Sequence, residues 1–96
     1  MSNQSFDQLL NMVNRTDFDN GKIKLIKNAL NSNKISAAQL TALVKVCDFD
    51  ASRLEISKSA YDSVVDKQNY FKVTEAFEFD FSKVELMDYI NKKPSK

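Results

Sequence analysis

Three pairs of acidic residues recur along the chain, and their spacing makes them the first candidates for chemistry. Each pair flanks a phenylalanine, in the runs Asp17-Phe18-Asp19, Asp48-Phe49-Asp50 and Glu78-Phe79-Asp80. Carboxylates spaced in this way could hold Ca²⁺, which takes about six to eight oxygen ligands. The first run does not fit an EF-hand loop, because its glycine stands at position five and Asn28 stands where a bidentate glutamate is needed. We therefore expect no metal here and interpret the acids as helix caps and partners of nearby cations.

A cation follows each acidic run, at Lys22, Arg53 and Lys83. These cations fall early in the helices predicted below, where the helix dipole disfavours positive charge. A compensating ion pair is expected with the acid five residues earlier, at Asp17, Asp48 and Glu78. The alternative is a phosphate cradle at the helix start. We favour the ion pair, because the neighbouring acids would repel an anion.

The first third of the chain also contains the lysines Lys22, Lys24 and Lys27, which are candidates for binding an anion. Phosphates of a lipid surface or of a nucleic acid would be the ligands. Residues in a helix turn by about 100° each, so these lysines should spread around the helix instead of lining one face. A solvated surface is the expectation, and weak contact with anionic lipid or nucleic acid is the alternative.

Residue types used in catalysis are scarce. The chain has no histidine and one glycine, so it can form neither a histidine-based triad nor a glycine-rich nucleotide loop. Its one cysteine, Cys47, lies on an apolar helical stripe and is predicted to be a small buried packing residue. We expect no enzyme, no catalytic residues and no cofactor.

The acidic runs belong to a longer sequence repeat. Phe18, Phe49 and Phe79 are 31 and 30 residues apart, and the likeness extends to either side of them. Leu9, Leu40 and Tyr70 correspond upstream, and Leu25, Ile56 and Leu86 correspond downstream. A period in this range is typical of tandem supersecondary units. The units run over about 5–35, 36–65 and 66–94.

Each unit is predicted to form two helices, near residues 5–15, 20–31, 36–47, 51–64, 66–77 and 81–91. Ser5-x-x-Gln8 and Ser36-x-x-Gln39 are capping boxes at the start of the first helix, and Asp66 with Asn69 is a weaker version. The second helix is predicted to start from an N-cap at Asp19, Asp50 or Asp80. The preceding phenylalanine and an aliphatic residue at N4 have the spacing of a hydrophobic staple. We therefore predict that Phe18, Phe49 and Phe79 are buried at the elbow between paired helices.

Composition bounds the fold class. Ninety-six residues with 43% apolar content suit a single domain over 1–96, with a disordered tail at 92–96. Scarce glycine and proline favour helices, so the prediction is all-α: three helical hairpins in one compact bundle or short solenoid. The net charge of +1 gives no bulk attraction to nucleic acid or lipid. Residues 1–7 contain no basic patch or apolar run, so we expect no export signal and a cytoplasmic setting.

Several of these residues also form a family pattern. The pattern comprises Phe49-Asp50-x-x-Arg53-Leu54, Lys58-x-Ala60-Tyr61, Asp66-x-x-Asn69-Tyr70 and Phe77-x-Phe79. It resembles the family catalogued as domain of unknown function 4476, over about residues 17–90. The resemblance implies an all-helical module of about this size, often attached to other domains, with no accepted activity and no catalytic residues. Bacterial relatives of this type often follow an export signal.

The third unit is rich in aromatic residues. Phe71, Phe77 and Phe81 replace smaller or polar residues at the matching positions of the other units. They could close the core, which we favour, or form a patch that binds a partner. The predicted function is a non-catalytic interaction or structural module whose partner is another protein or a second copy. The alternative is a peripheral binder of anionic lipid or nucleic acid through the lysines of the first unit.

Overall fold

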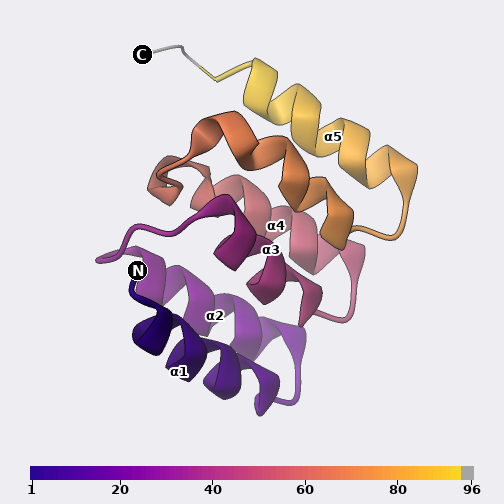
Figure 1. Ribbon diagram of the computed structural model, residues 1–96. Helices are drawn as coiled ribbons and strands as arrows, with labels where there is room; N and C mark the ends of the chain where they lie inside the picture. Colours follow the sequence, from indigo (N-terminus) through magenta and orange to yellow (C-terminus); the bar gives the residue numbers. More distant parts are fainter. Residues whose placement is uncertain (94–96) are drawn as a thin grey trace.

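The chain folds as a succession of helices, as seen in a computed structural model that describes residues 1–93 (Figure 1). The elements are α1 (Asn3–Asn14), α2 (Asp19–Leu30), α3 (Ala37–Lys45), α4 (Asp50–Ala60), the 3₁₀ segments η1 (Tyr61–Ser63) and η2 (Lys67–Ala76), and α5 (Asp80–Asn91). Within residues 1–93 the only extended pairing is an isolated bridge between Ile35 and Val64. The prediction of an all-α fold is therefore confirmed.

The helix starts differ in how well the sequence predicts them. At α3 the capping box forms as predicted, because Ser36 Oγ accepts the amide of Gln39 and Gln39 Oε1 accepts the amide of Ser36, both at 3.1 Å. The box predicted at Ser5 is wrong, since α1 starts earlier and is capped by Ser2. Asp66 does not cap its own helix. Its carboxylate accepts the amide of Ala37 at 2.8 Å, and the helix that follows is 3₁₀ instead of α.

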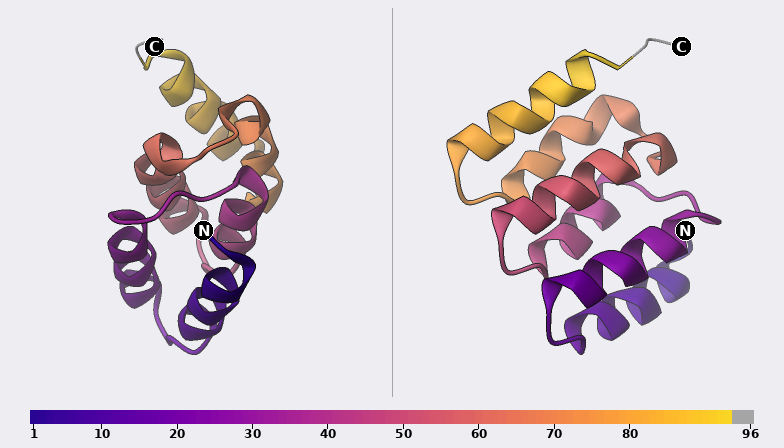
Figure 2. Two further views of the ribbon diagram at one scale, coloured as in Figure 1. Left: turned by 60° about the vertical axis from the view of Figure 1, so that its left-hand side comes forward. Right: turned by 180° about the vertical axis from the view of Figure 1, so that it is seen from behind.

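The helices form two layers. Figure 2 shows α2, α4 and α5 side by side in one layer, with α1, α3 and η2 in the other. Neighbours within a layer pack against each other, α3 against η2 and α4 against both α2 and α5. Buried apolar side chains fill the space between the layers, among them Val13, Ile26, Leu40, Val44, Ile56 and Leu86. Each helical pair contributes to this shared core, because a pair of about 30 residues could not bury its apolar faces alone.

The two connections between hairpins also touch each other. The amide of Ile35 donates to Ser63 O, and the amide of Val65 donates to Ile35 O, both at 2.9 Å. These connections lie on the side of the stack opposite to the loops that join the paired helices (Figure 1). The tail predicted to be disordered spans residues 92–96, of which 94–96 lie outside the described part. Within the described part, Lys93 Nζ lies 3.5 Å from the Asp62 carboxylate.

Candidate interaction surface

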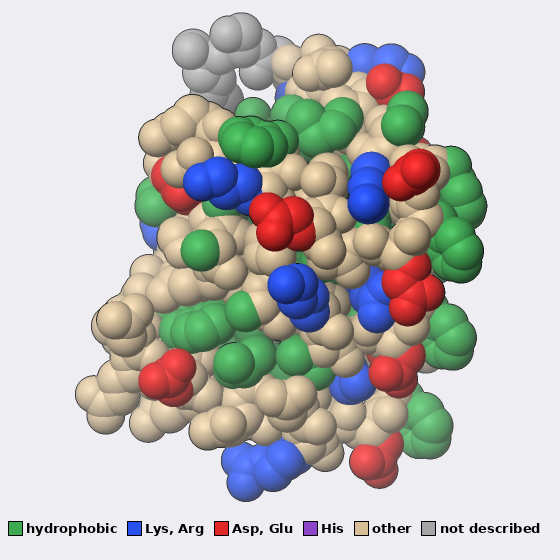
Figure 3. Space-filling view, turned by 45° about the vertical axis from the view of Figure 1, so that its right-hand side comes forward, with side chains coloured by type: hydrophobic (Ala, Val, Ile, Leu, Met, Phe, Trp, Pro, Cys, Tyr) green, Lys and Arg blue, Asp and Glu red, His purple; other side chains and the backbone are tan. Residues whose placement is uncertain are grey.

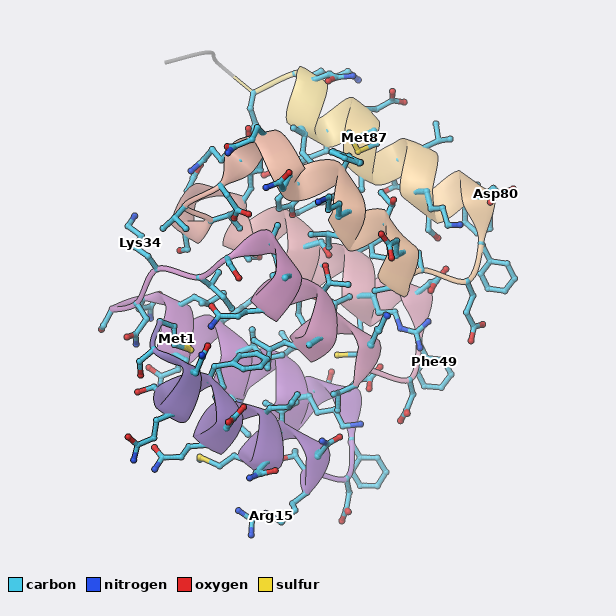
Figure 4. The ribbon with its side chains drawn as sticks, viewed as in Figure 1. Met1, Arg15, Lys34, Phe49, Asp80 and Met87 are labelled. Atoms are coloured by element: carbon cyan, nitrogen blue, oxygen red, sulfur yellow. The ribbon has the colours of Figure 1, made fainter. Side chains whose placement is uncertain are left out.

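The loops α1–α2, α3–α4 and η2–α5 lie along one side of the molecule, where Figure 4 labels Phe49 and Asp80. The prediction that their phenylalanines are buried is wrong. Phe18, Phe49 and Phe79 are 77%, 67% and 52% exposed. Each is the extended residue that immediately precedes its helix. Lys22 and Arg53, early in the helices that follow the first two loops, are buried, and their side chains donate to the carbonyls of Val46 and Cys47.

The acids at the helix starts join one loop to the next. Asp19 accepts the amides of Asp48 and Phe49, at 2.9 and 3.1 Å. Asp50 accepts the amides of Glu78 and Phe79 in the same way, with its shortest contacts at 3.0 and 2.9 Å. The prediction that these acids cap their own helices is therefore wrong. They are the first helical residues, and their carboxylates reach into the loop of the next hairpin.

These contacts change the acidity of both carboxyl groups. Burial by itself would raise the pKa of Asp50, but the amides of Glu78 and Phe79 together with Arg53 and Ser82 outweigh it and hold the pKa below the ordinary 3.8. The pKa of Asp19 is also lowered, because the loop amides and Ser52 outweigh its burial. Both carboxylates therefore favour the charged form that accepts these hydrogen bonds.

The cations of the first two loops complete the junctions between hairpins. Lys22 Nζ donates to Val46 O at 3.0 Å and lies 3.8 Å from Asp48. Arg53 Nη2 donates to Cys47 O at 2.7 Å, and Arg53 Nη1 lies 3.9 Å from Glu78. The predicted pairs of Lys22 with Asp17 and of Arg53 with Asp48 are therefore wrong, because the acids concerned belong to the next hairpin. Both cations lie near the acid of the following loop, and Arg53 Nη1 also pairs with Asp50 Oδ1 of its own helix at 2.9 Å.

The aromatic residues of the third hairpin fall in three different places. Phe77 is only 5% exposed and belongs to the core, as we predicted, whereas the prediction that Phe71 and Phe81 also close the core is wrong because both are exposed. Phe81 is exposed and stacks on Phe79 with ring centroids 5.6 Å apart, which adds it to the row of loop phenylalanines. Phe71 is exposed on η2, in a groove away from that row.

Exposed aromatic and acidic side chains therefore share one side of the molecule. We call this surface the loop edge; its residues are Phe18, Phe49, Phe79, Phe81, Asp17, Asp48, Glu78 and Asp80. Figure 3 shows hydrophobic side chains projecting along this margin, next to acidic ones. The sequence did contain a signal for it, because a phenylalanine between two charged residues in a short loop is difficult to bury without also burying a charge.

Sequence comparison agrees with the helical architecture. The sequence model of DUF4476, a domain of unknown function, matches residues 1–90. The chain belongs to this family. The resemblance expected from the sequence is thus confirmed. A search of curated proteins gave no match, and a search of solved structures gave none either.

The lysines considered for anion binding do not form a group of free cations in this DUF4476 domain. Lys22 is buried and bonded to the neighbouring hairpin. Lys27 Nζ lies 2.7 Å from Glu55 Oε2, and Lys24 is exposed to solvent. Two of the three positive charges are therefore already paired within the domain.

The remaining reactive groups are placed in the core. Cys47 is buried, and burial raises the pKa of its thiol to about 11, so it is protonated at neutral pH. Among residues 1–93, no group of three or more cysteine and acidic side chains is placed to hold a metal ion. None of the helices within that range is long and apolar enough to cross a bilayer.

Proposed function

We propose that this DUF4476 domain is a non-catalytic interaction module and that its loop edge binds an apolar segment of another protein. The observation that supports this most strongly is the exposure of Phe18, Phe49 and Phe79 at matching positions of three successive loops. Large exposed aromatic side chains gathered on one surface are typical of binding sites, because their burial against a partner is favourable. Rigid rings also lose little conformational entropy when they bind.

The charge of the loop edge suggests the chemistry of the partner. Asp17, Asp48 and Glu78 precede the three phenylalanines and have exposed side chains. A partner segment with apolar residues for the rings and lysine or arginine between them would match both features. The Asp19 and Asp50 contacts fix each loop relative to the next, so the row is held in place before binding. Such preorganisation lowers the entropic cost of association.

Binding to anionic lipid or nucleic acid remains the second candidate, and the contacts favour it less. It would use the first-hairpin lysines, of which Lys22 and Lys27 are paired, and the acids of the loop edge would repel phosphate. A reducing compartment such as the cytoplasm is part of the leading proposal. Its support is that the one cysteine is free and buried.

A displayed library of random peptides, selected against the immobilised domain, tests the proposal. We expect enriched peptides to combine aromatic or aliphatic residues with lysine or arginine. Their affinity should fall at least tenfold against a domain carrying Phe18→Ala, Phe49→Ala and Phe79→Ala. The matched control is Phe71→Ala, which removes an exposed ring outside the loop edge. The proposal is wrong if the triple variant binds the selected peptides as the parent does. It is also wrong if no peptide is enriched while the domain binds anionic vesicles or oligonucleotides and loses that binding with added salt.

A further inference from the structure

An open groove marks the C-terminal end of the stack. It has a volume of about 300 Å³ and lies between η2 and α5, lined by Phe71, Thr74, Lys83, Val84, Met87 and Asp88. The corresponding positions of the earlier hairpins are largely covered by the next hairpin. Val13, Lys22 and Ile26 are buried in the first hairpin, and Val44, Arg53 and Ser57 are buried in the second. The groove therefore occupies the place where, in a longer stack, the next hairpin would pack.

At the C-terminal end of the stack, Asp80 has no following loop among the described residues whose amides it could accept. Asp19 and Asp50 each accept two consecutive amides of the following loop. Asp80 is the third member of the series, and its side chain is 96% exposed, with Lys83 Nζ 3.5 Å away. At the opposite end of the stack, the first loop presents the corresponding amides of Asp17 and Phe18. No earlier hairpin among the described residues approaches that loop (Figure 1).

A second contact recurs at both internal junctions. Lys27 of α2 pairs with Glu55 of α4 at 2.7 Å, and Lys58 of α4 pairs with Glu85 of α5 at 3.0 Å. Continuing the 31- and 30-residue spacing, Asp88 is the next member on the C-terminal side. Lys24 holds the position of Glu55 and Glu85 on the N-terminal side. At the internal junctions a lysine faces a glutamate of the next hairpin, whereas here the acid Asp88 would face the lysine Lys24. The two charges are again opposite in sign.

The loop cations also leave residues of opposite charge at the two ends of the stack. Lys22 lies 3.8 Å from Asp48, and Arg53 lies 3.9 Å from Glu78. Their counterparts at the two ends of the stack are Lys83 and Asp17, which are again of opposite charge. The N-terminal end also exposes apolar surface. Met12 is 48% exposed at a position where Leu43 and Val73 are fully buried.

We propose that the C-terminal groove binds the N-terminal hairpin of a second copy of this chain, in a head-to-tail arrangement. Asp80 accepts the Asp17 and Phe18 amides of that copy, Lys83 faces its Asp17, and Asp88 faces its Lys24. One contact is missing, because Gly21 stands where Ser52 and Ser82 contribute hydroxyls at the internal junctions. The contact between copies is therefore weaker than the internal junctions. Since each copy keeps one free end, association continues beyond two copies instead of closing.

Sedimentation equilibrium of the full chain over a wide concentration range tests the proposal. The weight-average mass should rise above the monomer's 11.0 kDa and continue past twice that value. Asp88→Lys and Lys24→Asp should each weaken association about three- to tenfold, because each places like charges opposite one another. Both changes together in one chain should restore it, since the two charges are simply exchanged.

The controls separate this surface from the loop edge and from general charge effects. Lys45→Glu alters an exposed charge on α3, away from both end contacts, and should leave association unchanged. The three alanine substitutions at the loop-edge rings should also leave it unchanged, because their backbone amides remain. A chain that stays monomeric at every concentration overturns the proposal. So does a mass that stops at the dimer, or a double variant that associates no better than the single ones.

Discussion

Asp50 Oδ2 lies 2.9 Å from the backbone nitrogen of Phe79, which is 29 residues further along the chain. Asp19 and Phe49 form the matching pair at 3.1 Å, across 30 residues. In each pair the acid starts one helix and the phenylalanine precedes the helix beside it. A buried apolar contact would allow sliding along the helix axis, whereas two hydrogen bonds to consecutive amides fix the position of the loop.

Replacement of Asp50 by asparagine should destabilise the domain by about 1–3 kcal/mol, because one accepting oxygen and the negative charge are lost where two amides need acceptors. Arg53 Nη1, 2.9 Å from Asp50 Oδ1, also loses its charged partner. Urea unfolding monitored by circular dichroism would measure the change. Asp80→Asn is the matched control and should stay within about 0.5 kcal/mol of the parent, since its side chain is exposed. Equal losses at the two positions would contradict this role for Asp50.

Acid should weaken the fold through the same carboxylates. The pKa values of Asp19 and Asp50 in the folded state are below the ordinary 3.8, so the unfolded chain binds more protons near that pH. Their contribution is complete above the unfolded pKa and is lost as the pH falls through the folded one. The free energy of unfolding should therefore decline below about pH 4. A chain with asparagine at both positions should show a flatter decline, and an unchanged slope would assign the effect to other groups.

The elbow phenylalanines should contribute little to stability. Phe18→Ala and Phe49→Ala should change the free energy of unfolding by no more than about 0.5 kcal/mol, because both rings are in water before and after unfolding. Phe77→Ala should cost about 3–5 kcal/mol, since that ring is buried in the core. Urea midpoints of the three variants give the comparison. If Phe18→Ala or Phe49→Ala lowered the free energy of unfolding nearly as much as Phe77→Ala, these rings would be buried in solution.

Gly21 and Thr16 should show a coupled effect. A Cβ added at Gly21 would lie 2.7 Å from Thr16 Cγ2, and Thr16 is held by a hydrogen bond from its hydroxyl to Met12 O at 2.8 Å. Gly21→Ala should therefore destabilise the domain by about 1 kcal/mol, overpacking outweighing the better helix propensity of alanine. Thr16→Ser removes the methyl group and keeps the hydroxyl. In that background the alanine should be neutral or stabilising, and purely additive effects would show that the contact is relieved elsewhere.

The fold class was the part most accessible from the sequence. Helical spacing, the Ser36–Gln39 capping box and the scarcity of glycine and proline all predicted an all-helical chain, and they did so from local patterns. The state of η2 was not accessible in the same way. Its residues have helical spacing, but Asp66 bonds to Ala37 of another helix and does not cap its own. The helical spacing of the sequence does not distinguish an α segment from a 3₁₀ segment.

The junctions between hairpins were the part that local rules missed. An acid at a helix start suggests a cap for that helix, and nothing within a few residues of Asp19 or Asp50 indicates that the true partners are about 30 residues away. The staple rule likewise placed Phe18 and Phe49 in the core, because it considers only the spacing of two apolar residues, whereas both rings are exposed. The repeat aligns these acids and cations across the three units, but the alignment alone does not identify which unit's acid lies next to a given cation.

The carboxylate contacts of Asp19 and Asp50 all run in one direction, from each hairpin to the one that follows it. Each of these contacts joins adjacent hairpins, so inserting one more hairpin would repeat a junction of the same kind. Growth by duplication of residues 36–65 would bring its own acid, its own amides and its own cation. Such a protein would have one more exposed phenylalanine on its loop edge, and the existing contacts between hairpins would stay as they are.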